Sequence, residues 1–356
     1  MSAINLFEIE VLARERLQAS TADYFGGGSD DEVTLRANRT AFEEIFLRPR
    51  YLVDVSQRSL ETTVLGTPVS MPLLIAPTGF QALAHADGEL ATARAAAKAG
   101  TVMILSTFST YSLEEVRGEV EGPLWFQLYV HKDRGLTTGL VERAEAAGYE
   151  AIVLTVDVPV LGRRERDVRN EFVLPPDLRV ANFDIGQSDA LHDGDGESGL
   201  AAFHRGLRSP QFSWRELEWL VTKTRLPILL KGVLRGDDAA LGVDHGAKGI
   251  IVSNHGGRQL DGAIPGIRAL PDVVDAVGDR VDVLVDGGIR RGSDILKAIA
   301  LGARAVLVGR PAVWGLAWDG EAGLTRVLEI LKDEFDTAMA LTGAPTVGAI
   351  TRDLIA

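Results

Sequence analysis

Residues 72–106 read PLLIAPTGFQALAHADGELATARAAAKAGTVMILS, and this stretch contains the unit that decides the fold. It starts with an apolar run, passes through a turn into a helix-like segment that ends at Gly100, and closes on a second apolar run. Continuous apolar runs suit strands buried on both faces, and glycine is a common residue just past a helix end. The stretch therefore predicts a strand, a helix and a second, parallel strand.

The same alternation continues along the chain to residue 309. Eight apolar runs can be counted: PLLIA (72–76), VMILS (102–106), LWFQLY (124–129), AIVLTV (151–156), ILLK (228–231), GIIVS (249–253), VLVD (283–286) and AVLVG (305–309). Eight strand–helix units in one chain favour a closed (β/α)8 TIM barrel, an α/β fold. An open doubly wound sheet is the alternative, but the GxGxxG turn usual after its first strand is absent.

The chain is expected to be one domain, residues 1–356. We divide it into an N-terminal helical segment (1–70), a barrel core (71–320) and C-terminal helices (321–356). One connection between consecutive runs is much longer than the others. It is a lid-like loop at about 175–212, after the fourth run, and includes DIGQSDALHDGDGESG (184–199). Loops of this length are usually lids or disordered, and a solvated linker without a role is the alternative for its Asp-rich middle.

Composition excludes several classes of function. A net charge of −13 argues against a general nucleic-acid surface, because phosphate binding requires a basic field. The absence of cysteine excludes disulfides, thiolate chemistry and zinc–cysteine sites, and no metal is expected. The start, MSAINLFEIEVLARERL, does not read as a signal peptide, and no run of about 18 apolar residues predicts a membrane span. We expect a cytoplasmic protein without nucleic-acid or membrane partners.

Polar or turn-forming residues lie at or just after the end of each of the eight apolar runs. In a (β/α)8 barrel the chemistry lies at the carboxyl ends of the strands, so these residues are expected to meet at one mouth. They are Pro77 and Thr78, Ser106, Gln127 and Tyr129, Thr155 and Asp157, Lys231, Ser253 with His255 and Arg258, Asp286, and Gly309 with Arg310. Polar side chains at every strand end indicate a large ligand, which a barrel built for packing alone would not need.

The last two strand ends predict a phosphate site. They read VDGGIRRGSD (285–294) and LVGRP (307–311), which place glycines and backbone N–H groups beside Arg290 and Arg310. Glycine lets the backbone approach an oxyanion closely, arginine neutralises it, and barrels commonly bind phosphate at these two strands. Turn glycines with solvated arginines are the alternative.

His255 is the candidate base. It lies two positions after the sixth apolar run, within SNHGGRQLDG (253–262), three residues before Arg258. A base beside a cation suits removal of a proton from an anionic substrate. Asp157, after the fourth run, could hold the imidazole in one tautomer, and Arg163 or Arg164 could bind a carboxylate. A hydrogen-bonded structural histidine is the alternative.

The chain resembles the FMN-dependent 2-hydroxy-acid oxidase and dehydrogenase family. The resemblance covers almost the whole sequence and rests on APTGFQ, FQLY, TVDVPVLGRRERD, SNHGGRQLD, DGGIRRG and VGRP, in this order. It implies FMN as cofactor and oxidation of an (S)-2-hydroxy acid to the 2-oxo acid, with O2 reduced to H2O2. It also implies a homotetramer or octamer.

The resemblance assigns a role to each site residue. His255 would accept the proton as hydride equivalents pass to the flavin, and Asp157 would pair with its imidazole. Lys231 would lie beside flavin N1 and O2. The substrate contacts would be Tyr24, Phe108, Tyr129, Arg164 and Arg258. The flavin ring and ribityl contacts would be Pro77, Thr78, Gly79, Ser106, Gln127, Thr155, Ser253 and Asp286, and the phosphate contacts Gly288, Arg290, Gly309 and Arg310.

Two positions depart from the family pattern. Gly79 stands where the oxidases usually have alanine, which leaves open a dehydrogenase with another electron acceptor or a lactate monooxygenase-like reaction. Phe108 stands where glycolate oxidases have tryptophan, so L-lactate is favoured, with glycolate or mandelate-like acids as alternatives. A dehydrogenase that reduces membrane quinone is disfavoured because DALHDGDGESGL (189–200) is polar. A non-catalytic FMN- or phosphate-binding barrel is disfavoured by the complete set of catalytic side chains.

Overall fold

A computed structural model describes residues 3–183 and 212–356. Eight parallel strands form a closed barrel in the order β10, β3, β4, β5, β6, β7, β8, β9. The strands are β3 (Leu73–Ile75), β4 (Met103–Leu105), β5 (Leu124–Leu128), β6 (Ile152–Thr155), β7 (Ile228–Val233), β8 (Gly249–Val252), β9 (Asp282–Asp286) and β10 (Ala305–Val308). Each lies within or overlaps one of the eight apolar runs, so the predicted (β/α)8 barrel is confirmed.

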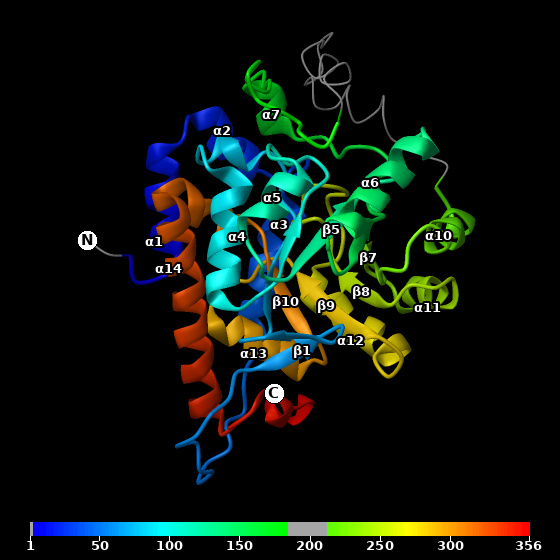
Figure 1. The fold of residues 1–356 in the computed structure, drawn as a ribbon. Helices are drawn as coiled ribbons and strands as arrows, with labels where there is room; N and C mark the ends of the chain where they lie inside the picture. Colours follow the sequence, from blue (N-terminus) through cyan, green and yellow to red (C-terminus); the bar gives the residue numbers. More distant parts are fainter. Residues whose placement is uncertain (1–2, 184–211) are drawn as a thin grey trace.

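Helices surround the barrel (Figure 1). They are α4 (Gly88–Ala99), α5 (Leu113–Glu119), α6 (Arg134–Ala146), α7 (Glu165–Arg169), α10 (Trp214–Val221), α11 (Gly236–Asp244), α12 (Gly266–Val277), α13 (Gly292–Ala300) and α14 (Arg310–Thr342). Non-helical backbone at Asp319 and Gly320 interrupts α14, at the point where the sequence divides barrel core from C-terminal helices. Most of the predicted lid-like loop lies outside the described residues. Within them, no helix combines the length and apolarity that a membrane crossing needs.

Alternate strand residues pack into two separate layers of core. Leu74 lies in the barrel interior with Trp125 and other strand residues, whereas its neighbours Leu73 and Ile75 pack in the layer that includes the surrounding helices. This alternation follows from the two-residue period of a strand. Both faces of each strand are therefore buried, which explains why the runs are continuously apolar.

The segment before the barrel is only partly helical. It contains α1 (Leu6–Arg16), α2 (Ala19–Gly26) and α3 (Val33–Glu43), and α1 packs along α14 (Figure 1). The rest, predicted as helical up to residue 70, instead includes an antiparallel hairpin, β1 (Thr62–Val64) and β2 (Thr67–Val69). Val64 and Val69 pack into the interior core, so the hairpin adds apolar side chains to the barrel. Three-residue strands are too short to show a clear period in the sequence.

Residues 23–34, which we call the N-terminal strap, cross to the carboxyl ends of the strands. The backbone N–H of Ser29 donates to Gly257 O at 2.9 Å, and that of Asp30 donates to Arg163 O at 2.9 Å. These contacts join the strap to the segments that follow β8 and β6. The strap therefore forms part of the barrel mouth.

Candidate active site

A cavity of about 1150 Å³, measured with its open mouth, lies at the carboxyl ends of the strands. This is large enough for a cofactor, since typical ligand pockets measure roughly 300–1,000 Å³. Its lining contains every predicted site residue except Asp157 and Ser253, which lie behind it and hydrogen-bond lining residues. The rest of the lining is mainly apolar, and the polar strand ends in the sequence do not indicate these residues: Phe25, Ala76, Phe80, Val158, Leu161, Ile289, Leu307, Val308, Pro311 and Val313.

His255 and Asp157 form a hydrogen-bonded pair. His255 Nδ1 lies 3.0 Å from Asp157 Oδ1 and 3.2 Å from Oδ2. A proton on Nδ1 would leave Nε2 as the acceptor, as in other carboxylate–imidazole pairs. Burial lowers the pKa of His255 below its usual 6.5, although Asp157 opposes the shift. The imidazole is therefore neutral at pH 7 and able to accept a proton.

The backbone holds His255 in an uncommon conformation. Its φ of 58° is left-handed, and Gly256 and Gly257 follow with φ of 64° and 75°. The Ser253 hydroxyl accepts the His255 N–H at 3.0 Å. Four residues on in the same loop, the Gln259 amide donates to the backbone carbonyl of Asp157 at 2.9 Å. Conformations of this kind cost about 1–3 kcal/mol and persist where the surrounding structure enforces them.

Lys231 lies at the centre of the mouth, paired in register with Thr155. Its ammonium lies 3.0 Å from Asp286 Oδ2 and donates to the Ser253 hydroxyl at 2.9 Å. Burial alone would lower the pKa of Lys231, but Asp286 and Asp157 outweigh it, so the pKa is raised and the amine stays charged. The other oxygen, Asp286 Oδ1, is buried and has no hydrogen-bond partner among the described residues. It is an acceptor suited to a ligand hydroxyl.

Three polar side chains form a chain across neighbouring strand ends. The Gln127 amide donates to the Thr155 hydroxyl at 3.1 Å, and the Ser106 hydroxyl donates to Gln127 Oε1 at 3.4 Å. All three side chains are buried and line the cavity. Such a row can offer donors and acceptors to the heteroatoms of a flat ring.

The loop after β9 is shaped for close approach of a ligand. Gly287 and Gly288 have φ of 90° and 87°, and a Cβ on Gly288 would lie 1.9 Å from Asn38 O, so only glycine fits. Arg39 Nη1 donates to Gly288 O at 2.9 Å and also pairs with the buried Asp294. Asp294 accepts the backbone N–H groups of Arg290 and Arg291 as well. The loop is therefore fixed from behind, as a phosphate cradle requires.

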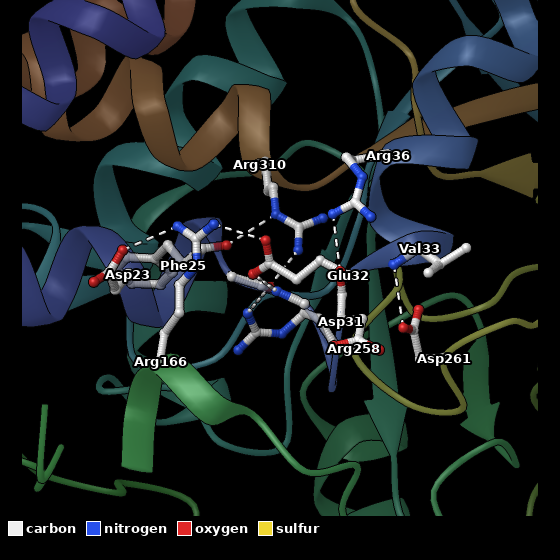
Figure 2. Close-up of polar contacts among 12 residues, drawn as sticks. Asp23, Phe25, Asp31, Glu32, Val33, Arg36, Arg166, Arg258, Asp261 and Arg310 are labelled. Carbon is white, nitrogen blue, oxygen red and sulfur yellow. Dashed lines mark hydrogen bonds and ion pairs between the residues drawn. The ribbon is translucent and has the colours of Figure 1, made fainter. Parts of the chain in front are cut away.

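The side chain of Arg310, which lines the cavity, also makes contacts that the sequence did not indicate. It donates to three backbone carbonyls, Phe25 O at 2.9 Å, Gly256 O at 2.8 Å and Gly27 O at 2.7 Å. Figure 2 shows its guanidinium directed toward the strap. The backbone N–H of Arg310, at the first residue of α14, remains in a position that suits an anion.

Arg258 and Arg164 bring positive charge to the other end of the cavity. Arg258 donates to Gly27 O at 3.0 Å, and its guanidinium lies 5.2 Å from the centre of the Tyr24 ring. Burial and the nearby charge of Arg164 lower the pKa of Arg258 to about 10. Arg164 is 9% exposed, and its Nε has no hydrogen-bond partner among the described residues. Arg164 is buried and Arg258 is partly buried, and neither forms an ion pair among the described residues, although Asp167 lies close enough to attract both. Two cations with a single acid nearby favour an anionic ligand.

Aromatic rings form the wall beside these arginines. The ring of Phe108 stacks on Phe80 at 6.0 Å and lies 5.4 Å from Tyr129. Two further rings support the wall from the segment after α7, because Phe172 stacks on Tyr24 at 4.6 Å and Phe183 on Phe108 at 5.8 Å. Sequence reasoning missed these last two, since no periodicity marks them.

Comparisons with known proteins show the family to which this chain is similar. Residues 13–356 match the family model described as FMN-dependent dehydrogenase. An L-lactate oxidase from Nostoc sp. is 59% identical over 96% of this chain and 95% of its own length. Glycolate oxidase from Spinacia oleracea is 50% identical over 100% of this chain and 96% of its own. The crystal structure of a mandelate oxidase with (S)-4-hydroxymandelic acid superposes with a TM-score of 0.95 and 46% identity, covering 99% and 98% of the two chains.

Proposed function

The chain belongs to the FMN-dependent dehydrogenase family, and on this premise we propose that it oxidises L-lactate to pyruvate and reduces O2 to H2O2. One observation carries the proposal. The His255–Asp157 pair adjoins a cavity that is also lined by Arg258 and Arg164, two cations that form no ion pair among the described residues. A base next to an anion site is the arrangement that oxidation of a 2-hydroxy acid requires. The relatives named for lactate, glycolate and mandelate support this substrate class.

The residues present fit FMN. Gly288 and the first residues of α14 suit the phosphate, Asp286 Oδ1 suits a ribityl hydroxyl, and the buried polar row with Lys231 suits the ring. When bound, FMN supplies a two-electron acceptor that O2 can reoxidise. The charged Lys231 would stabilise the negative charge that reduction brings to the ring.

The chain's own side chains would handle charge and protons. Arg258 and Arg164 would bind the substrate carboxylate, with the phenols of Tyr24 and Tyr129 as further hydrogen-bond partners. This orientation would point the hydroxyl at His255 Nε2, which accepts its proton. Asp157 would stabilise the imidazolium that results. Over one turnover, L-lactate and O2 become pyruvate and H2O2, so atoms and electrons balance.

L-lactate is proposed over glycolate because Phe108 is smaller than the tryptophan that glycolate oxidases have at this position, which leaves room for a larger acid. L-lactate is proposed over mandelate because the ring of Phe183 supports Phe108 from behind. The test is anaerobic bleaching of the flavin by glycolate, L-lactate and (S)-mandelate, followed by admission of O2 and assay of peroxide and pyruvate. We expect the highest kcat/KM for L-lactate, with one peroxide and one pyruvate per turnover. Reduced flavin that survives for many seconds in air would favour a dehydrogenase. Acetate and carbon dioxide would indicate a monooxygenase-like reaction.

A homotetramer or octamer is proposed for the assembly. Support comes from large apolar side chains exposed on the surface, including Phe46, Tyr51, Leu52 and Val53 in the segment after α3. A cluster of this kind commonly marks a protein interface. Light scattering on the FMN-loaded protein decides the stoichiometry, and a monomer would contradict the proposal.

A further inference from the structure

Arg166 connects α7 to both ends of the N-terminal strap. Its Nη1 lies 3.1 Å from Asp23 Oδ1, and its Nη2 lies 2.7 Å from Glu32 Oε2. Figure 2 shows the guanidinium between these two carboxylates. A planar, forked cation is the side chain suited to join two acids in this way. Arg166 has no predicted role in binding FMN or substrate.

The two carboxylates are themselves anchored. Glu32 Oε1 accepts the backbone N–H of Gly28 at 3.0 Å, inside the strap, and Asp23 Oδ2 accepts the Asn170 amide at 2.9 Å, just after α7. The bridge therefore fixes the turn between Asp23 and Glu32, not merely two mobile side chains.

Residues next to the bridge face the substrate end of the cavity. Tyr24 adjoins Asp23, and Arg164 lies two positions before Arg166; both line the cavity. The Tyr24 ring also stacks on Phe172, which follows α7, with only 7° between the ring planes. Arg258 reaches the strap through Gly27 O. The Arg166 bridge thus sets the distance between α7 and the strap, the two elements that carry Tyr24 and Arg164.

Charge gives the bridge a second consequence. The chain has a net charge of −13, and Asp23 and Glu32 would stand uncompensated beside an anion site if Arg166 were neutral. The side chains of Arg166, Asp23 and Glu32 are 38%, 31% and 16% exposed, so solvent screens them only in part. Isolated exposed ion pairs contribute little, whereas a partly buried network with two partners contributes more.

We propose that Arg166 is a positioning residue for the substrate carboxylate: by bridging Asp23 and Glu32 it holds Tyr24 opposite Arg164 and Arg258. This inference rests on the proposed function. It predicts an effect on binding of carboxylate ligands, with FMN retention and the chemical step largely preserved, because Arg166 itself does not line the cavity.

The test uses the full-length, FMN-loaded protein and the variants Arg166→Met, Arg166→Lys and Arg169→Met. Arg169 is the matched control, because it lies on the same helix, pairs with Glu165 alone among the described residues and is 75% exposed. KM for L-lactate is measured with kcat, and the Kd of oxalate is read from the flavin difference spectrum. Thermal unfolding and flavin content report on folding.

Arg166→Met should raise both KM and the oxalate Kd by about tenfold while kcat changes by less than about twofold. Arg166→Lys should restore only part of the loss, since one ammonium cannot span both acids. Arg169→Met should match the wild type. An unchanged oxalate Kd in a folded, flavin-loaded Arg166→Met protein would overturn the proposal.

A triple variant separates positioning from charge. Adding Asp23→Asn and Glu32→Gln to Arg166→Met removes the uncompensated acids but does not rebuild the bridge. We expect the oxalate Kd to stay high. A return of the Kd to its wild-type value would show that Arg166 acts only by neutralising the negative charge of Asp23 and Glu32. If no 2-hydroxy acid bleached the wild-type flavin, the proposed function would fail. If the wild type is bleached but the oxalate Kd of Arg166→Met equals that of the wild type, only the positioning role of Arg166 fails.

Discussion

The imidazole of His255 is partly buried and lies next to a carboxylate, and these two features shift its pKa in opposite directions. Burial has the larger effect, so the pKa lies below 6.5. The base works in its neutral form, so a lowered pKa extends activity toward acid: the rate constant of flavin reduction should be flat near pH 7 and fall only below pH 6.5. Stopped-flow reduction by saturating L-lactate across pH gives this profile.

Asp157→Asn tests the same pair. Removing the carboxylate takes away the charge that raises the pKa of His255, so the acid limb should move to still lower pH. The rate at pH 7 should nevertheless fall by on the order of 10²–10⁴-fold, because the imidazolium formed during proton transfer loses its partner. An acid limb that moves to higher pH would contradict the assigned pairing. Flavin content serves as the control, since Asp157 does not line the cavity.

Gly79→Ala probes the contact between two loops. A Cβ at Gly79 would lie 3.2 Å from both the Cβ and the carbonyl oxygen of Phe108, so that residue must shift by a few tenths of an ångström. We expect a changed rate of flavin reoxidation by O2. We also expect KM to rise above its wild-type value by a larger factor for (S)-mandelate than for L-lactate. Gly118→Ala, which meets nothing within 4 Å, is the control. If the rates of flavin reduction and reoxidation are the same in the two variants, Gly79 has no role in either half-reaction.

Among the elements, the glycine loop between β9 and α13 depends on an ion pair beneath it. Asp294 is buried and accepts from Arg39 and from the backbone N–H groups of Arg290 and Arg291. Asp294→Asn should lower the free energy of unfolding by about 1–3 kcal/mol and weaken FMN retention, because a charged acceptor is lost behind the cradle. Urea denaturation and equilibrium dialysis measure the two effects.

Glu43→Gln is the matched control for that ion pair. Glu43 is the other, more exposed partner of Arg39, so its loss should change stability by less than about 0.5 kcal/mol. If the two variants lower the free energy of unfolding equally, the buried Asp294 contributes no more than an exposed ion-pair partner.

The strands and their polar ends could be predicted because each depends on local sequence. An apolar run followed by Lys231 or Asp286 places that side chain at the mouth once the barrel closes, whatever the loops do. The task of Arg310 could not be predicted, because its carbonyl partners Phe25 and Gly27 are brought near by chain paths some 285 residues apart. Phe172 and the β1–β2 hairpin were missed for the same reason: long-range packing fixes them, and no period in the sequence marks them.

At the scale of the whole molecule, an acidic protein places several partly buried cations around one mouth. Burial lowers the pKa of Arg258, Arg290 and Arg310, and in each case another arginine adds to the lowering. Mutual repulsion of this kind destabilises the ligand-free mouth, and a bound phosphate dianion would relieve it. Ligand binding should therefore stabilise the fold through its charge as well as its contacts.

The last prediction compares FMN with riboflavin on the apoprotein. At a free concentration of 1,000 Kd, FMN should add about 4 kcal/mol to the stability of the native state. Riboflavin at the same concentration should raise Tm far less, because it lacks the phosphate. Arg290→Met should remove most of that difference, whereas Arg310→Met should lower Tm with either ligand, since its side chain holds the strap. Equal shifts from FMN and riboflavin in the wild type would mean that the glycine loop and the start of α14 do not bind phosphate. The cations at this mouth would then serve the substrate alone.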